Sequence, residues 1–173
     1  MGRPLIRYLL NAGMLSRFSQ YNKSAVLADD FKKSCILWPL FKLQMSKEKF
    51  HIEFLMGNAT LSSLWRMISQ IDGLSEWFAD DVSMNEAETV YTFTWGKTSN
   101  KAVIVNQKPQ SSIRYRWIDE EEESSYFEFM LHKLDLSGDM TLEITDFAEP
   151  DEKGDSIALW ESQVEEMKRR LGV

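Results

Sequence analysis

The sequence predicts an α+β fold, in which a curved antiparallel sheet of about six strands wraps around a long C-terminal helix. Three observations lead to this prediction. Residues 60–80 have the pattern of two short helices in tandem, and a strand-like segment precedes them. Apolar residues then alternate with polar ones through most of residues 89–147, which indicates a series of strands. In the last element, apolar residues recur every three or four positions, as in an amphipathic helix.

Length and composition limit the function classes. The chain has 173 residues, which fits one domain, and 43% of them are hydrophobic, enough for a sizeable core. No run of about 18 apolar residues is present, so no membrane span is predicted. Cys35 is the single cysteine, so no internal disulfide can form and we expect a cytoplasmic protein. The net charge of −7 argues against nucleic-acid binding, which needs clustered lysines and arginines.

A change in charge divides the chain near Met45. Residues 1–44 carry seven basic and two acidic side chains, whereas residues 45–173 carry 13 basic and 25 acidic ones. The first segment could be a targeting sequence, a membrane-surface arm, or a segment outside the working protein. We favour the last interpretation, because Met45-Ser-Lys-Glu-Lys resembles a natural bacterial start and the segment has no sustained periodicity. We therefore expect residues 1–44 to be disordered or absent from the native protein, and residues 45–173 to form the domain.

The domain is expected to begin with a strand and two short helices. A strand is predicted at residues 49–56, where Phe50, Ile52 and Phe54 alternate with polar residues. Thr60 can cap a first helix, and Asp72-Gly73 is expected to separate it from a second. The apolar residues of the two helices are Leu61, Leu64, Trp65 and Ile68 in the first, and Leu74, Trp77 and Phe78 in the second.

An antiparallel meander should follow, closed by a long helix. A compact turn is expected at Ser137–Asp139, and an acidic loop tip at Asp119–Glu123. Asp155 or Ser156 can cap the helix, and Gly172 can end it. The strands of the meander are predicted at 89–95, 101–105, 113–117, 126–136 and 140–147. The helix carries one apolar stripe, made of Ile157, Trp160, Val164, Met167 and Leu171.

Two motifs resemble a known family. Leu64-Trp65 lies on the first short helix, and Gly73-Leu74-Ser75-Glu76-Trp77-Phe78 on the second. With Trp160 in the closing helix, they resemble the helix-grip fold of the START-like (SRPBCC, or Bet v 1-like) superfamily. The most similar branch is the one named for the activator of the heat-shock protein 90 ATPase. The resemblance covers residues 45–173, although Lys153-Gly154-Asp155 replaces the branch's apolar-Gly-Trp and Asn58-Ala59-Thr60 replaces its helix-start proline.

The resemblance implies a cavity between sheet and helix, and the aromatic residues are the candidates to line it. On the sheet they exceed what one helix stripe can cover, so some should face a ligand. The alternative is that they are ordinary core, which we favour for Trp65. The candidate cavity residues are Trp65, Tyr91, Phe93, Trp95, Tyr115, Trp117, Phe127, Phe129 and Trp160.

No catalytic or metal-binding constellation is predicted. His51 and His132 are the only histidines, and both fall on the polar phase of their strands. Two such histidines do not supply the three or four ligands of a metal site, and Cys35 lies outside the domain. Arg114 and Glu128 are expected to pair across strands rather than to bind an anion.

Two function classes follow from these observations. The first is a non-enzymatic domain that binds a small apolar molecule or lipid in the cavity, without a cofactor. The second is a protein-interaction module, as the resemblance to the chaperone activators implies, with Asp119–Glu123 as a possible contact surface. A weaker third class is an enzyme of the cyclase or hydrolase kind. It would need inward-facing polar groups, for which the sequence offers Gln107 and the hydroxyls of Tyr91 and Tyr115.

Overall fold

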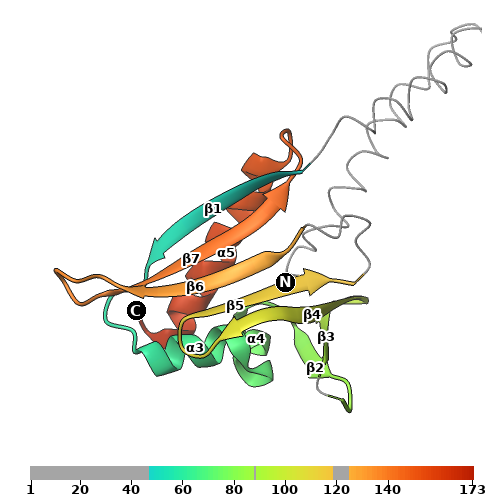
Figure 1. Ribbon diagram of the computed structural model, residues 1–173, viewed down its shortest axis with the longest axis horizontal. Helices are drawn as coiled ribbons and strands as arrows, with labels where there is room; N and C mark the ends of the chain where they lie inside the picture. The colour runs from blue at the N-terminus through green and yellow to red at the C-terminus, as the bar shows by residue number, and fades with distance from the viewer. Residues whose placement is uncertain (1–46, 88, 119–124) are drawn as a thin grey trace, which may run out of the picture.

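The computed structural model describes residues 47–87, 89–118 and 125–173 (Figure 1). The predictions made for residues 1–44 and for the acidic run Asp119–Glu123 concern segments outside the described residues, so they stay predictions. None of the described helices combines the length and apolar character needed to cross a membrane.

The described chain forms one antiparallel sheet with three helices, and the order of elements is the predicted one apart from an additional strand, β2 (Figure 1). Strands lie in the order β1-β7-β6-β5-β4-β3-β2, so β2 to β7 form a meander and β1 joins its far edge. The strands are β1 (Glu48–Leu55), β2 (Asp81–Met84), β3 (Val90–Trp95), β4 (Thr98–Lys108), β5 (Ser112–Trp117), β6 (Phe127–Lys133) and β7 (Met140–Ala148). The helices are α3 (Leu61–Ser69), α4 (Ile71–Trp77) and α5 (Lys153–Leu171).

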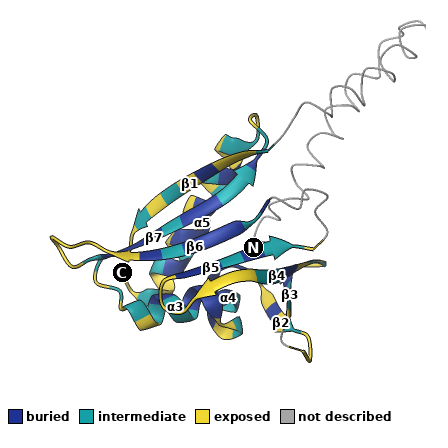
Figure 2. Ribbon diagram, in the orientation of Figure 1, coloured by how far each residue is buried: buried dark blue, intermediate teal, exposed yellow. Residues whose placement is uncertain are grey.

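One face of the sheet is buried and carries the core. On β3 the side chains of Tyr91, Phe93 and Trp95 are buried, while the alternate residues are only half-buried. Buried positions continue onto β5, β6 and β7, where α5 runs across the sheet (Figure 2). The predicted α+β fold, with helices covering one face of an antiparallel sheet, is therefore confirmed.

The sheet has seven strands rather than about six, because the sequence analysis missed β2. This strand has only four residues, and Val82 is its single buried side chain between the exposed Asp81 and Ser83. Such a short segment carries too little alternation to be recognised. The hairpin between β6 and β7 is also longer than the predicted turn, because Leu134 N donates to Asp139 O across a six-residue connection (2.8 Å).

The break between the two short helices lies at Gln70, not at Asp72-Gly73 as predicted. Gln70 has an extended backbone (φ −104°, ψ 148°), and Gly73 lies inside α4. The glycine is needed for packing, since a Cβ built at Gly73 would lie 2.2 Å from the carbonyl oxygen of Arg66 in α3. The Arg66 side chain bridges the same two helices, with Nη1 donating to Asp72 and to Glu76 (2.8 Å each).

The closing helix begins earlier than predicted. Its N-cap is Glu152, so Asp155 and Ser156 lie in the first turns and do not cap it. Lys153-Gly154-Asp155 has no apolar periodicity, which is why the sequence pattern placed the start further along. The end is as predicted: Gly172 is left-handed (φ 75°) and its N–H donates to Lys168 O.

The close contact at Gly73 predicts a large effect of a single methyl group. Gly73→Ala should destabilise the protein by about 1–3 kcal/mol despite the better helix propensity of alanine, because backbone atoms of Arg66 and Met67 must move. The measurement is the free energy of unfolding in urea.

Gly154→Ala is the matched control. Gly154 is also helical, but a Cβ there meets nothing within 4 Å, so alanine should stabilise by up to about 1 kcal/mol. Equal effects of the two substitutions would contradict the proposed packing of α3 on α4.

Candidate functional site

Most of the aromatic side chains predicted to line a cavity lie on the covered face of the sheet, whereas Trp65 is on α3 and Trp160 on α5. Seven of the nine are buried, whereas Trp65 and Trp117 are half-buried. The seven buried residues are Tyr91, Phe93, Trp95, Tyr115, Phe127, Phe129 and Trp160. We call these seven residues together with Trp117 the aromatic face.

Rings of the aromatic face contact one another from strand to strand. Tyr115 and Phe127 stack with centroids 5.0 Å apart, and Phe127 lies 4.9 Å from Trp117. Phe93 meets Trp117 edge to face at 5.5 Å. Trp65 makes no such ring contact among the described residues; it lies on α3 at the border of the core, as favoured from the sequence.

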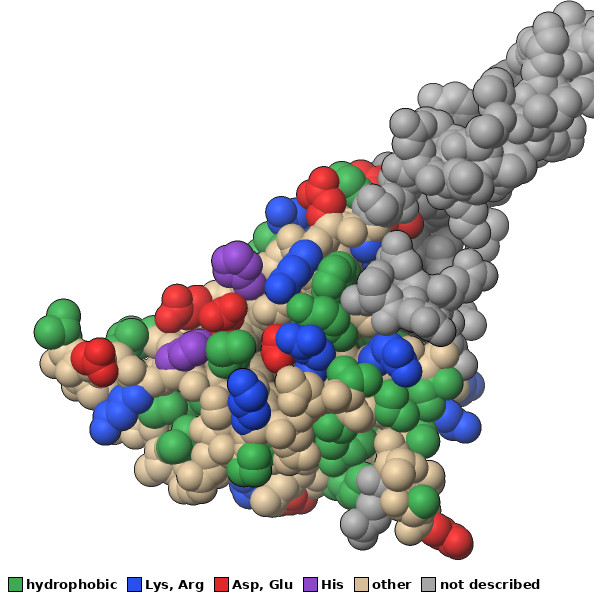
Figure 3. Space-filling model, in the orientation of Figure 1, with side chains coloured by type: hydrophobic (Ala, Val, Ile, Leu, Met, Phe, Trp, Pro, Cys, Tyr) green, Lys and Arg blue, Asp and Glu red, His purple; other side chains and the backbone are tan. Residues whose placement is uncertain are grey.

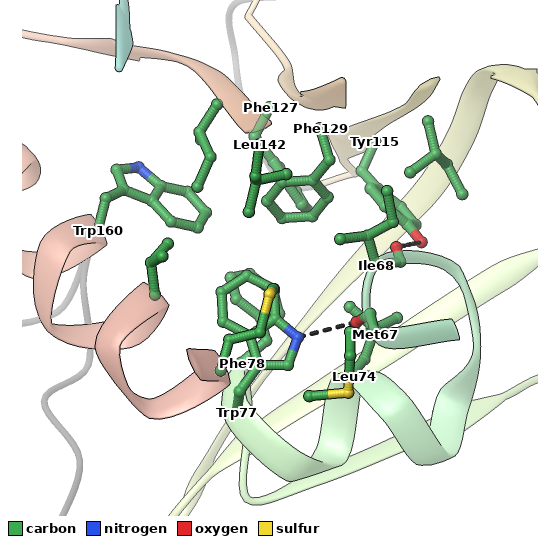
Figure 4. Close-up of a cluster of buried hydrophobic side chains, with 14 of the residues drawn as sticks. Met67, Ile68, Leu74, Trp77, Phe78, Tyr115, Phe127, Phe129, Leu142 and Trp160 are labelled. Carbon is green, nitrogen blue, oxygen red and sulfur yellow. Dashed lines mark hydrogen bonds between the residues drawn. The ribbon is translucent and has the colours of Figure 1, made fainter. Parts of the chain in front are cut away.

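The centre of the aromatic face is occupied by Phe78, which follows α4. Its ring lies 5.1 Å from Phe93, 5.6 Å from Phe127 and 5.8 Å from Trp160, with which it is nearly parallel (Figure 4). The neighbouring Trp77 contacts Phe129 at 5.7 Å. The sequence analysis placed Phe78 in the second short helix and in a family motif, and did not identify it as part of the site. Its position directly after a short amphipathic helix was the available signal.

The polar ends of three aromatic side chains donate to the last carbonyls of α3. Trp77 Nε1 donates to Met67 O (2.8 Å), Tyr115 OH to Ile68 O (2.9 Å) and Tyr91 OH to Ser69 O (3.3 Å); the first two bonds are drawn in Figure 4. The last four carbonyls of a helix have no partner within the helix. These side chains therefore cap α3 while their rings pack in the core.

The backbone carbonyl of Phe78 connects the sheet, the end of α4 and α5. Phe78 O accepts from Trp95 Nε1 at 2.7 Å and from Gln163 Nε2 at 3.4 Å. Gln163 is 9% exposed, and its Oε1 atom is buried without a hydrogen-bond partner among the described residues. The sequence analysis missed Gln163, because it lies between Trp160 and Val164 in the helix pattern and interrupts the apolar stripe.

The polar groups named from the sequence as candidates for catalysis are the hydroxyls of Tyr91 and Tyr115 and the side chain of Gln107. The hydroxyls of Tyr91 and Tyr115 are donors to backbone carbonyls, and burial raises the pKa of Tyr115 well above its usual value. Gln107 was expected to face inward, but it is exposed near the end of β4, beyond a register shift between Ile104 and Asn106. Beyond this shift, inward-facing and outward-facing side chains no longer alternate in the order on which the prediction relied.

The opposite face of the sheet carries the charged pairs. Arg114 on β5 holds Glu128 on β6 with two hydrogen bonds, at 3.2 and 3.0 Å, and its guanidinium lies 4.0 Å from the ring centre of Tyr126. The predicted cross-strand pair is thus confirmed. His51 and His132 are both exposed, and no group of metal-binding side chains occurs in the described residues.

Removing one capping hydroxyl tests this arrangement. Tyr115→Phe should destabilise the protein by about 1–3 kcal/mol, because Ile68 O is left buried without its donor while the ring contacts remain. Tyr126→Phe is the control on the opposite face, and it should change the free energy of unfolding by no more than about 0.5 kcal/mol. A Tyr115→Phe protein as stable as the control would show that the bond does not hold α3.

The raised pKa of Tyr115 adds a pH dependence. The folded-state pKa lies above the unfolded value of about 10, so the contribution of this group is complete below pH 10 and is lost as the pH rises further. Part of the alkaline loss of stability should therefore disappear in Tyr115→Phe, as measured by urea unfolding between pH 8 and pH 11.

The fold and its aromatic face can be compared with known proteins. A model of the START-like superfamily domain matches residues 44–173. The solved structure of BfR322 from Bacteroides fragilis is 42% identical, with a TM-score of 0.52 over 73% of this chain and 92% of that one. No curated protein matches the chain.

Two more distant structures share the fold. The Aha1 dimer from Colwellia psychrerythraea is 15% identical, with a TM-score of 0.60 over 72% of this chain and 96% of that one. The protein XoxI from Bacillus cereus is 10% identical, with a TM-score of 0.57 over 73% and 96% of the two chains. The family match covers most of the chain, and the arrangement of sheet and helices agrees with it. This chain belongs to the START-like superfamily.

Proposed function

We propose that this domain binds one small apolar or lipid-like molecule between the sheet residues of the aromatic face and α5, as a cytoplasmic protein and without catalysing a reaction. The observation that carries the proposal is the unpaired Oε1 of Gln163, buried beside aromatic rings. A buried acceptor without a donor costs about 1–3 kcal/mol. A ligand that places a hydroxyl or N–H group at this oxygen removes that cost.

The surrounding side chains define the chemistry of the ligand. Trp160, one turn before Gln163 on α5, stacks on Phe78 and lies 5.8 Å from Phe129. The remainder of the ligand must therefore be apolar and pack against rings. Because Phe78 occupies the centre of the aromatic face, binding requires its ring to move with the ligand taking over its contacts.

The hydrogen bonds that the buried side-chain donors make to the backbone support binding without a chemical reaction. Tyr91, Tyr115, Trp77 and Trp95 all direct their polar atoms to backbone carbonyls, where they stabilise the fold. A general acid or base must instead be within reach of the reacting group. In this proposal the side-chain amide of Gln163 positions a ligand and catalyses no reaction of it.

Interaction with a protein partner, the alternative from the sequence, is the second candidate. Leu134 and Leu136 are exposed on the hairpin between β6 and β7, and Leu55 is exposed at the end of β1 beside β7. Apolar side chains stand out on this tip in the space-filling view (Figure 3). Exposed apolar side chains gathered at one place favour contact with another macromolecule.

The experiment compares matched probes on the full chain. Native mass spectrometry of the purified protein first detects a co-purified ligand. Titration with 1-dodecanol, and with its methyl ether as a probe that lacks the donor, then measures affinity by calorimetry. We expect the alcohol to bind more tightly than the ether by about tenfold, the equivalent of one hydrogen bond of about 1.4 kcal/mol.

Substitution of the glutamine assigns the effect to Gln163. Gln163→Met keeps the size of the side chain but removes the acceptor, so the preference for the alcohol should vanish. Gln107→Met, at the exposed glutamine of β4, should leave it unchanged. An empty protein that binds neither probe would refute ligand binding, and capture of a partner lost on Leu136→Asp would then favour the interaction module.

A further inference from the structure

Within the described residues, β1 is the long outer strand of the sheet, with one edge unpaired. In the described residues β1 pairs only with β7, regularly from Glu48 opposite Ala148 to Leu55 opposite Thr141, without a register shift (Figure 1). The other edge strand, β2, has four residues. Natural edge strands are usually kept from pairing by shortness, bulges, proline or charged side chains, and of these β1 has only the charged side chains, Glu48, Lys49 and Glu53.

The backbone groups that face the open edge follow from one hydrogen bond. Met56 N donates to Met140 O at 2.8 Å, so the backbone of Met56 points toward β7. In an antiparallel pair the direction of the backbone groups alternates along the strand. The N–H and C=O groups of Phe50, Ile52 and Phe54 therefore point to β7, and those of Lys49, His51 and Glu53 point to the open edge.

The side chains of β1 are complementary to a second copy of the same strand. When two β1 strands run antiparallel about a two-fold axis at His51, Lys49 of each copy lies opposite Glu53 of the other. Lys49, His51 and Glu53 are also the residues whose backbone groups face the edge. This register therefore forms backbone hydrogen bonds and places opposite charges together at the same time. On the other face of the strand, Phe50 of one copy lies opposite Ile52 of the other. In the single chain the Ile52 side chain is half-buried.

Neighbouring registers do not combine charged pairs with apolar pairs in the same way. Moving the axis to Ile52 places Lys49 opposite Leu55. Moving it to Phe50 places Lys47 opposite Glu53, but Ile52 then lies opposite Glu48 instead of Phe50. The charged and apolar pairs together thus favour the register centred on His51.

We propose that the protein forms a symmetric dimer in which the β1 strands of two copies pair edge to edge, with His51 at the two-fold axis. The sheet then continues from one copy into the other, and a symmetric interface of this kind closes on itself. Pairing also covers the half-buried side chains of Ile52 and Phe54 at the edge.

Charge reversal on the full chain tests the register. Lys49→Glu and Glu53→Lys each create two like-charge contacts, and each should raise the dimer dissociation constant by about tenfold or more in sedimentation at low salt. The double variant K49E/E53K restores both pairs in reversed order, so its dissociation constant should return to within about threefold of the wild type. Lys97→Glu, in the turn between β3 and β4, is the control for net charge and should have no effect.

A proline substitution tests the backbone pairing. His51→Pro removes an N–H that faces the open edge, so the pairing of β1 with β7 and the circular dichroism spectrum should be retained while the dimer is lost. A wild-type protein that stays monomeric up to about 1 mM would overturn the proposal. A dimer that persists in both His51→Pro and the single charge reversals would overturn it equally.

Discussion

The structure depends on the carboxyl end of α3, where three carbonyls accept hydrogen bonds from aromatic side chains. Met67, Ile68 and Ser69 receive donors from Trp77, Tyr115 and Tyr91, which come from α4, β5 and β3. A buried helix end without such partners would be unfavourable, and water cannot reach these positions. The side chains whose rings bury the helix end also supply its hydrogen bonds, so packing and capping depend on the same residues in this domain.

This constraint fixes the site. Once α3 is held, the close approach at Gly73 sets α4 against it, and Phe78 is placed at the centre of the aromatic face. The carbonyl of Phe78 then ties β3 to α5 through Trp95 and Gln163. The proposed ligand position is the one place in this network where a buried acceptor lacks a donor among the described residues of the interior. Function is therefore proposed at an incompletely hydrogen-bonded position of this network. The hydroxyl of Thr141 on β7 is the other buried side-chain atom without a partner among the described residues.

The sequence predicted the elements with strong periodicity and missed those determined by tertiary contacts. The alternation of Tyr91, Phe93 and Trp95 and the stripe of α5 identified the covered face correctly, because burial on one side leaves a periodic pattern. The role of Gly73 depends on a contact with Arg66 in another helix, and no local pattern encodes it. Phe78 and Gln163 were not recognised as parts of the site for the same reason. Phe78 packs on Phe127 of β6, and Gln163 donates to the carbonyl of Phe78, both far away in the sequence.

The most direct test of this account is hydrogen exchange at the tryptophan indoles, followed by NMR on the full chain. Trp77 and Trp95 donate to buried carbonyls, whereas Trp65 is half-buried on α3. We expect the indole protons of Trp77 and Trp95 to exchange only through global unfolding, with the same free energy as the slowest backbone amides of β6. The Trp65 indole should exchange much faster. Rapid exchange of the Trp77 indole, at a rate near that of Trp65, would contradict the claim that aromatic donors cap α3 and hold the domain together.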